Sequence, residues 1–141
     1  MKKILILLSL IGLLSSGSCK KIIDGPECGT PVKVDDDIFT NGPKHPINIQ
    51  KVTIDHDCLE LVISSSGCSG SDWKVMLVTP QGYAEPIPVV RDIRVSMDSI
   101  GLCAASFENT FTFDLTNFRL DNENKIELKL EGWDQEIIYN Y

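Results

Sequence analysis

The sequence has little of what several functional classes require. Behind residue 14 it has no apolar run approaching the roughly 20 residues that a membrane-spanning helix needs. It has 2 histidines and no C-x2-C pair, so the paired ligands typical of zinc sites are missing. Its 13 basic residues are outnumbered by 20 acidic ones, which makes nucleic acid a poor partner. We therefore expect no metal, no cofactor and no nucleic-acid partner.

The first residues do have a recognisable pattern, which is that of an export signal. Lys2 and Lys3 precede an apolar run of 11 residues (4–14), and small residues follow at 15–18. The stretch "SGSC" that ends at Cys19 resembles the lipobox of bacterial lipoproteins, although Ser16 stands where leucine is common. We expect residues 1–18 to be a signal peptide and Cys19 to be the lipid attachment site. An acylated Cys19 would anchor the protein to a membrane of the cell envelope, and we expect the outer membrane.

The number of cysteines supports this assignment. Exported proteins usually pair their cysteines in disulfides, and five cysteines leave one over. If Cys19 carries lipid, four remain, and these allow three pairings. Cys68 and Cys103 both lie in loops beside strands, which favours a Cys68–Cys103 bridge and leaves Cys28 with Cys58.

Beyond residue 46 the apolar residues alternate with polar ones, which is typical of β-strands. Seven or eight short alternating segments are separated by turn signals, and helical spacing is absent. This pattern predicts an all-β domain, an antiparallel β-sandwich of the immunoglobulin-like kind that is stapled by disulfides. A slip in the alternation near Gln50 and Lys51 predicts a β-bulge.

An immunoglobulin-like arrangement of Cys58, Trp73 and Cys103 offers a different pairing of the cysteines. The tyrosine that family has two residues before its second cysteine is replaced by Gly101. The comparison therefore supports a sandwich and not membership of that family.

The chain divides into three parts on this interpretation. Residues 1–18 are the signal, residues 19–46 are the lipidated N-terminus and a tether rich in proline, glycine and charge, and residues 47–141 are the β-sandwich domain. Loss of the signal removes Lys2 and Lys3, so the formal charge falls from −7 to −9. Such a charge favours solubility and disfavours anionic partners.

Few residues stand out as candidates for a site. "GCSGS" lacks the second glycine of a hydrolase elbow, because Ser71 occupies that position, and a strand follows in place of a helix. We expect no catalytic residues. Most aromatic residues occupy core-facing strand positions, but Tyr83 and Trp133 lie beside turns and are candidates for surface binding.

From about residue 52 onward the segments "SSSGCSGSDWKVML", "CAASFENTFTFDLTNF" and "KIELKLEGW" resemble a group of small β-sandwich lipoproteins of Bacteroidota. A histidine often found three residues after the first cysteine of that group is Ser71 here. The resemblance implies fold and location, and no activity. We expect a non-catalytic, lipid-anchored envelope protein that binds a protein or glycan. The alternatives are a barrel-type carrier of a small apolar ligand and an envelope hydrolase.

Overall fold

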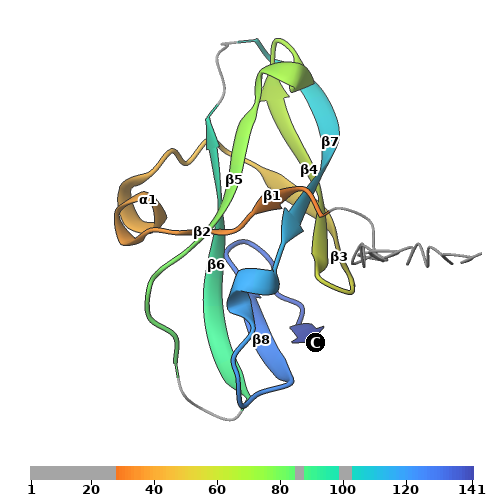
Figure 1. Ribbon diagram of the computed structural model, residues 1–141. Coiled ribbons are helices and arrows are strands. Elements are labelled where there is room, and N and C mark those ends of the chain that lie inside the picture. The colour runs from red at the N-terminus through yellow and green to blue at the C-terminus, as the bar shows by residue number, and fades with distance from the viewer. Residues whose placement is uncertain (1–27, 85–87, 99–102) are drawn as a thin grey trace, which may run out of the picture.

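A computed structural model of the protein describes residues 28–84, 88–98 and 103–141. Two sheets form a sandwich (Figure 1), which confirms the all-β prediction. The four-stranded sheet has the order β1 (Thr30–Pro31), β7 (Ala105–Asp114), β4 (Cys58–Gly67), β3 (Asn48–Asp55). The five-stranded sheet has the order β2 (Lys33–Val34), β5 (Lys74–Thr79), β6 (Val89–Asp98), β8 (Lys125–Leu130), β9 (Ile137–Asn140). One short helix, α1 (Asp36–Asn41), and two 3-10 turns, η1 (Gly70–Asp72) and η2 (Thr116–Phe118), complete the described elements.

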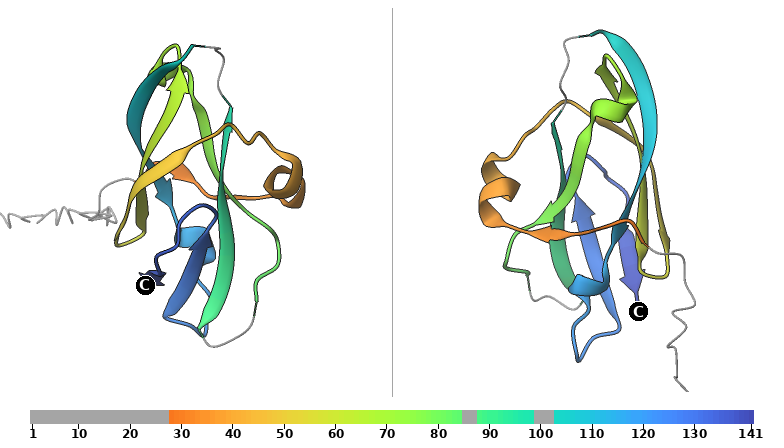
Figure 2. Two further views of the ribbon diagram at one scale, coloured as in Figure 1. Left: turned by 180° about the vertical axis from the view of Figure 1, so that it is seen from behind. Right: turned by 45° about the horizontal axis from the view of Figure 1, so that its top comes forward.

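The sheets are mixed, whereas the sequence predicted antiparallel ones. Three pairings are parallel: β1 with β7, β2 with β5, and β6 with β8. Alternation shows which residues face the core but does not give strand direction. β6 and β8 run in the same direction because β7, in the other sheet, lies between them in the chain (Figure 2).

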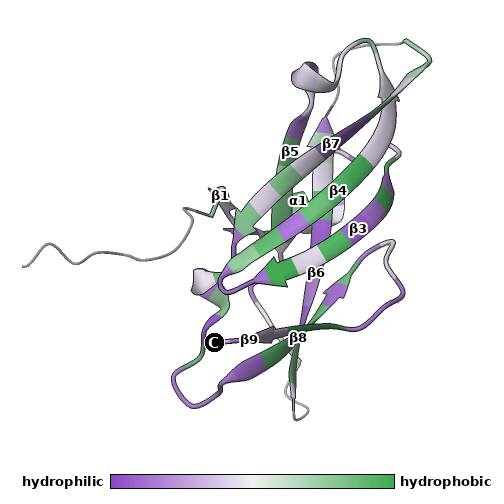
Figure 3. Ribbon diagram, turned by 90° about the vertical axis from the view of Figure 1, so that its right-hand side faces the viewer, coloured by the Kyte–Doolittle hydropathy of each residue, from purple (hydrophilic) through white to green (hydrophobic). Residues whose placement is uncertain are grey.

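The interior between the sheets is filled by side chains from both of them. Along β4 the inward residues alternate with outward ones, and the same alternation runs along β7 and β8 (Figure 3). The largest fully buried side chains are Tyr139, Phe113, Phe118, Leu59, Leu61, Ile63, Leu77, Ile93, Met97, Leu115, Ile126 and Leu128. Burial of this apolar surface is the main force that holds the two sheets together.

β3 contains the irregularity that the sequence predicted. Ile49 pairs with Ile63 and Lys51 pairs with Val62, so Gln50 is an extra residue that has no paired residue in the ladder. Its side chain donates a 2.9 Å hydrogen bond to the Ser64 hydroxyl on β4. This β-bulge keeps Ile49 directed at the core although the alternation shifts after it.

The segment assigned to the tether contributes to the sandwich from Cys28 onward. β1 joins one sheet and β2 joins the other, with Val32 buried between them at 3% exposure. α1 begins at the N-cap Asp35, whose side chain accepts a hydrogen bond from the backbone N–H of Ile38. The sequence predicted no helix here because six residues are too few to show a helical period.

Arg94 fixes α1 to the outer side of β6. It is 2% exposed, and its guanidinium donates hydrogen bonds to the carbonyl oxygens of Phe39, Pro43 and Ile38. These carbonyls lie at the C-terminal end of α1 and in the segment after it, and the Ile38 carbonyl also accepts the backbone N–H of Gly42. α1 and this segment therefore cover part of the outer side of the five-stranded sheet (Figure 1).

Two disulfides join parts of the chain that are distant in sequence. Cys28 bonds to Cys58 and Cys68 bonds to Cys103, with Cα–Cα distances of 5.1 and 4.6 Å. This is the pairing that the positions of the cysteines favoured, and the immunoglobulin-like Cys58–Cys103 bridge is not formed. In the described parts of the chain, none of the helices has the length and apolar character needed to cross a membrane.

Candidate functional site

The outer side of the four-stranded sheet is the candidate site, because it combines polar side chains in ordered rows. Cross-strand pairing places Thr53, Glu60 and Thr112 in one row on β3, β4 and β7. The neighbouring row is Lys51, Val62 and Thr110. We call this surface the outer sheet face and define it by Lys51, Thr53, Asp55, Glu60, Val62, Glu108, Thr110 and Thr112.

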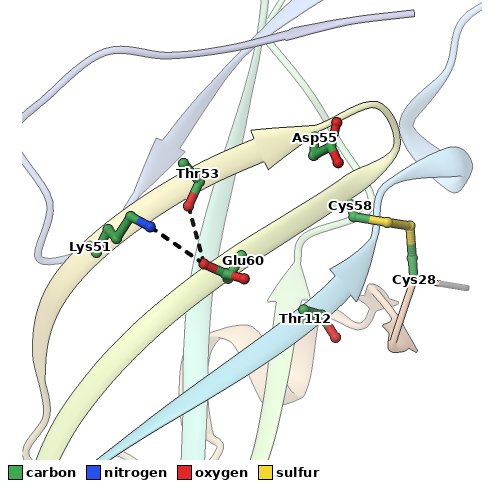
Figure 4. A pocket seen from close by; sticks show the side chains of 7 residues that line it. All are labelled: Cys28, Lys51, Thr53, Asp55, Cys58, Glu60 and Thr112. Atoms are coloured by element: carbon green, nitrogen blue, oxygen red, sulfur yellow. Dashed lines mark hydrogen bonds and ion pairs between the residues drawn. A yellow bond between two sulfur atoms is a disulfide. The ribbon is translucent and has the colours of Figure 1, made fainter. Parts of the chain in front are cut away.

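A shallow, open pocket of about 340 Å³ lies on the outer sheet face beside a disulfide (Figure 4). Glu60 lies at its centre, and its carboxylate accepts a 3.4 Å hydrogen bond from the Thr53 hydroxyl. The Lys51 ammonium lies 3.7 Å from the same carboxylate. The residues that line the pocket are Cys28, Lys51, Thr53, Asp55, Cys58, Glu60 and Thr112.

The chemistry of this pocket suits polar contacts. The side chains of Lys51 and Glu60 keep 59% and 40% of their accessible surface, so both can bind an incoming group. Hydroxyl groups supply donors and acceptors, and carboxylates outnumber the single ammonium group on the outer sheet face. Within the described ranges, no group of three or more His, Cys, Asp or Glu residues is placed to hold a metal ion.

Gly29 explains how the chain passes so close to this pocket. A Cβ at position 29 would lie 2.2 Å from the carbonyl oxygen of Thr112 and 2.5 Å from its hydroxyl. Only glycine allows this close approach to β7 at the residue that links the Cys28–Cys58 disulfide to β1. The wall of the pocket is therefore held by a covalent bond and by tight backbone packing.

A polar cluster lies at the same end of the sheet, next to the β3–β4 turn. Arg119 binds the carboxylate of Asp57 through hydrogen bonds of 2.6 and 2.7 Å, and the Tyr139 hydroxyl donates to the same carboxylate. Burial alone would raise the pKa of Asp57, but the hydrogen bonds from Tyr139 and Arg119 outweigh it, and the pKa is lowered. Burial and the hydrogen bond to Asp57 raise the pKa of Tyr139 to about 12. The cluster joins the two sheets.

The structure places the two predicted surface aromatics in different surroundings. Tyr83 is 41% exposed, and the guanidinium of Arg91 lies 4.9 Å from the centre of its ring. Trp133 is partly buried against the core and lines a hollow of about 390 Å³ beside β8, which Tyr83 does not line. Cys19, the predicted lipid attachment site, lies outside the described residues.

Sequence reasoning did not identify the outer sheet face as a site. The only sequence feature that pointed to this face is the segment "SFENTFTFDLT", where the polar residues Glu108, Thr110 and Thr112 alternate with core phenylalanines. Alternation of this kind occurs in any half-buried strand. The neighbours of these residues on β3 and β4 depend on strand order, which the sequence does not show.

No family model matches the chain, and no curated protein matches it. Among the solved structures that share its fold are three from Bacteroides and Parabacteroides. A NigD-like immunity protein from Bacteroides caccae has a TM-score of 0.58 at 15% identity, covering 80% of this chain and 63% of that chain. A protein described as toxin-related from Parabacteroides distasonis has a TM-score of 0.58 at 12% identity, covering 81% and 61%.

The third structure is a protein of unknown function from Bacteroides vulgatus, with a TM-score of 0.52 at 15% identity, covering 79% and 57%. This chain therefore spans less than two thirds of the length of each of the three. At such identities the similarity shows the fold alone.

Proposed function

We propose that this protein is a non-catalytic, lipid-anchored envelope protein that binds a basic protein on its outer sheet face. The observation that carries the proposal is the outer sheet face itself, a polar surface with an excess of carboxylates over one lysine. Complementary charge accelerates association and selects partners, so a partner with a basic surface fits it best.

The fold similarity narrows the class of partner. One of the similar structures is an immunity protein and another is described as toxin-related. Together with the acidic outer sheet face, this favours a basic protein toxin as the partner. A lipid on Cys19 would hold the domain at the membrane, where an incoming toxin arrives.

The filled interior disfavours the alternative of an apolar ligand carrier. A carrier needs an apolar cavity of several hundred cubic ångströms, whereas large side chains from both sheets fill the space between them. Three pockets that described residues line all have charged side chains in their walls, for example Glu60, Glu127 and Asp92.

The proposal is tested in a strain that lacks the protein and is challenged with proteins secreted by related strains. We expect the deletion to cause sensitivity and the wild-type protein to remove it. Glu60→Lys combined with Glu108→Lys should fail to protect, since both changes reverse charge on the outer sheet face. Asp134→Lys combined with Glu136→Lys, two exposed charge reversals on the β8–β9 connection, is the matched control and should protect.

A photo-cross-linking residue at Thr110 identifies the contact directly. It should capture one basic secreted protein, whereas the same residue at Lys129 on the other sheet should not. If Glu60→Lys with Glu108→Lys still cross-links to the basic protein, or if this double variant still protects the strain, the proposed binding surface is contradicted. Mass spectrometry of the mature protein tests the anchor separately, because an unmodified Cys19 would contradict lipidation while leaving the binding surface intact.

A further inference from the structure

Arg91 is a buried cation to which the described part of the chain supplies no anionic partner. It lies on β6 opposite the inward residue Leu128 and is 7% exposed. Its Nε is buried without a hydrogen-bond partner. No carboxylate or carbonyl oxygen of the described residues binds its guanidinium.

The guanidinium groups of the other two arginines both have hydrogen-bond acceptors within the protein. Arg94 is bound by carbonyl oxygens at the end of α1, and Arg119 is bound by the carboxylate of Asp57. Buried charges in proteins are as a rule paired, because removal of an ion from water is costly. Arg91 departs from this rule within a chain that otherwise follows it.

Two aromatic rings hold Arg91 in place. Its Cζ lies 4.9 Å from the centre of the Tyr83 ring and 5.0 Å from the centre of the Phe118 ring. Contacts between a guanidinium and aromatic faces stabilise the cation but leave its N–H groups, which point outward in its plane, without acceptors. Phe118 is fully buried, while Tyr83 is 41% exposed, so the site opens to solvent on the Tyr83 side.

We propose that Arg91, held between Tyr83 and Phe118, is a receptor for one carboxylate group of a ligand or partner. A planar carboxylate matches the edge of a guanidinium through two parallel hydrogen bonds. This geometry requires a fixed guanidinium, which the two rings provide. The acidic character of the whole domain selects against ligands with several negative charges. The site does not depend on the outer sheet face or on a lipid anchor.

The test is a titration followed by NMR of the Arg91 Nε–H group. N-acetylglycine supplies a free carboxylate, and N-acetylglycinamide is its neutral counterpart. We expect a saturable shift with the acid, none with the amide, and no shift of the Arg119 Nε–H signal with either. Arg91→Lys has no Nε–H, so its titration is followed through the backbone amide signal of residue 91. This variant should bind at least tenfold more weakly, since a lysine has the charge without the planar fork.

A capped peptide with one internal aspartate distinguishes two sources of the carboxylate. Tighter binding of this peptide than of N-acetylglycine indicates a protein side chain, and the reverse order indicates a small acid or a chain terminus. Equal shifts with acid and amide, or an unchanged affinity in Arg91→Lys, would overturn the proposal.

Thermal stability gives an independent readout. A buried arginine without an anion lowers the stability of the ligand-free protein, because its charge is removed from water without compensation. Arg91→Met should therefore leave Tm unchanged or raise it. The sequence also contains Glu85, and Glu85→Gln serves as the control. If both variants lower Tm by more than about 5 °C, Arg91 has a partner within the chain and the proposal is wrong.

Discussion

Asp57 joins three parts of the chain that are far apart in sequence. Its carboxylate accepts hydrogen bonds from Arg119 and Tyr139, and its backbone carbonyl accepts one from the N–H of Leu115 at 2.8 Å. The β3–β4 turn, the segment around η2 and β9 thereby meet at one residue. Because β9 belongs to the other sheet, this contact closes one end of the sandwich.

Removal of the Tyr139 hydroxyl tests the strength of this contact. We expect Tyr139→Phe to lower the free energy of unfolding by about 1.5–3 kcal/mol, since the hydrogen bond is to a charged group. Urea unfolding at several pH values checks the origin of the effect. The lowered pKa of Asp57 adds stability that is present above its unfolded pKa and lost as the pH falls through its folded pKa. The raised pKa of Tyr139 adds stability that is fully present below about pH 10 and lost as the pH rises through about 12.

The difference between wild type and Tyr139→Phe should therefore be largest near neutral pH and shrink toward both extremes. Tyr141→Phe is a control, because the Tyr141 hydroxyl accepts a hydrogen bond from the backbone N–H of Leu120 and has none with Asp57. A constant difference from acid to alkaline pH would mean that packing and not the hydrogen bond accounts for the loss.

At the scale of single elements, α1 depends on a residue outside it. Its six residues are too few for an isolated helix to be stable in water. Arg94→Met keeps the length of the side chain and removes the hydrogen bonds to the carbonyl oxygens of Ile38, Phe39 and Pro43, together with one to the carbonyl oxygen of Val95. We expect a loss of about 3 kcal/mol and faster hydrogen exchange in α1. Glu131→Gln should cost less than about 0.5 kcal/mol, since Glu131 lies 4.0 Å from Arg94 and is 60% exposed. Unchanged exchange in α1 would contradict this role of Arg94.

The bulge in β3 offers a test by deletion. Ile49 and Lys51 already face consecutive residues of β4, so deletion of Gln50 would leave a continuous ladder with every other pair unchanged. We expect the deletion to preserve the fold and stability. It should increase self-association in analytical ultracentrifugation, because a regular edge strand pairs with other chains more readily. Deletion of Thr53 is the contrasting variant. It should unfold the domain, because a one-residue shift would move the inward side chains of the rest of β3 to the solvent face and the outward ones to the core. A folded, monomeric protein after both deletions would refute the assignment of Gln50.

The β-bulge and the disulfide pairing could be predicted because each follows from positions in the sequence. The slip between Ile49 and Val52 is visible as a change of phase, and Cys68 and Cys103 border strands. α1 and Arg94 could not be predicted in the same way. A buried arginine in "VVRDIRVSM" has the pattern of an outward polar residue, and only the position of α1 explains why Arg94 is buried.

At the scale of the whole molecule, the candidate sites depend on which strands are neighbours. Thr112 and Thr53 are far apart in sequence and reach one pocket because β4 lies between β7 and β3. Arg91 gains its two aromatic neighbours from the loop before β6 and from η2. Strand order therefore decides the pocket on the outer sheet face, whereas the surroundings of Arg91 depend on the positions of the loop before β6 and of η2. Alternation of apolar residues shows neither of these, because it is compatible with many strand orders.

The disulfides also determine how the molecule responds to a pull on its N-terminal segment. Force applied at Cys19 enters the described domain at Cys28 and passes directly to Cys58 on β4, which bypasses β1, β2, α1 and β3. The second bridge bypasses the chain between Cys68 and Cys103. Together the two loops, with separations of 30 and 35 residues, hold about 230 Å of extended chain at roughly 3.5 Å per residue.

Single-molecule pulling between Cys19 and Tyr141 should therefore release about 230 Å less chain from the oxidised protein than from the reduced one. Cys28→Ala with Cys58→Ala should recover close to half of this length and lower the free energy of unfolding by about 4 kcal/mol. Cys68→Ala with Cys103→Ala should release the remaining chain length and lower the free energy of unfolding by a similar amount. The two double variants are therefore matched controls for each other. Equal extensions with and without reductant would show that the load does not pass through the bridges. The expected difference means that, while both bridges hold, the load does not pass through β3 and the elements before it and cannot draw them out as extended chain.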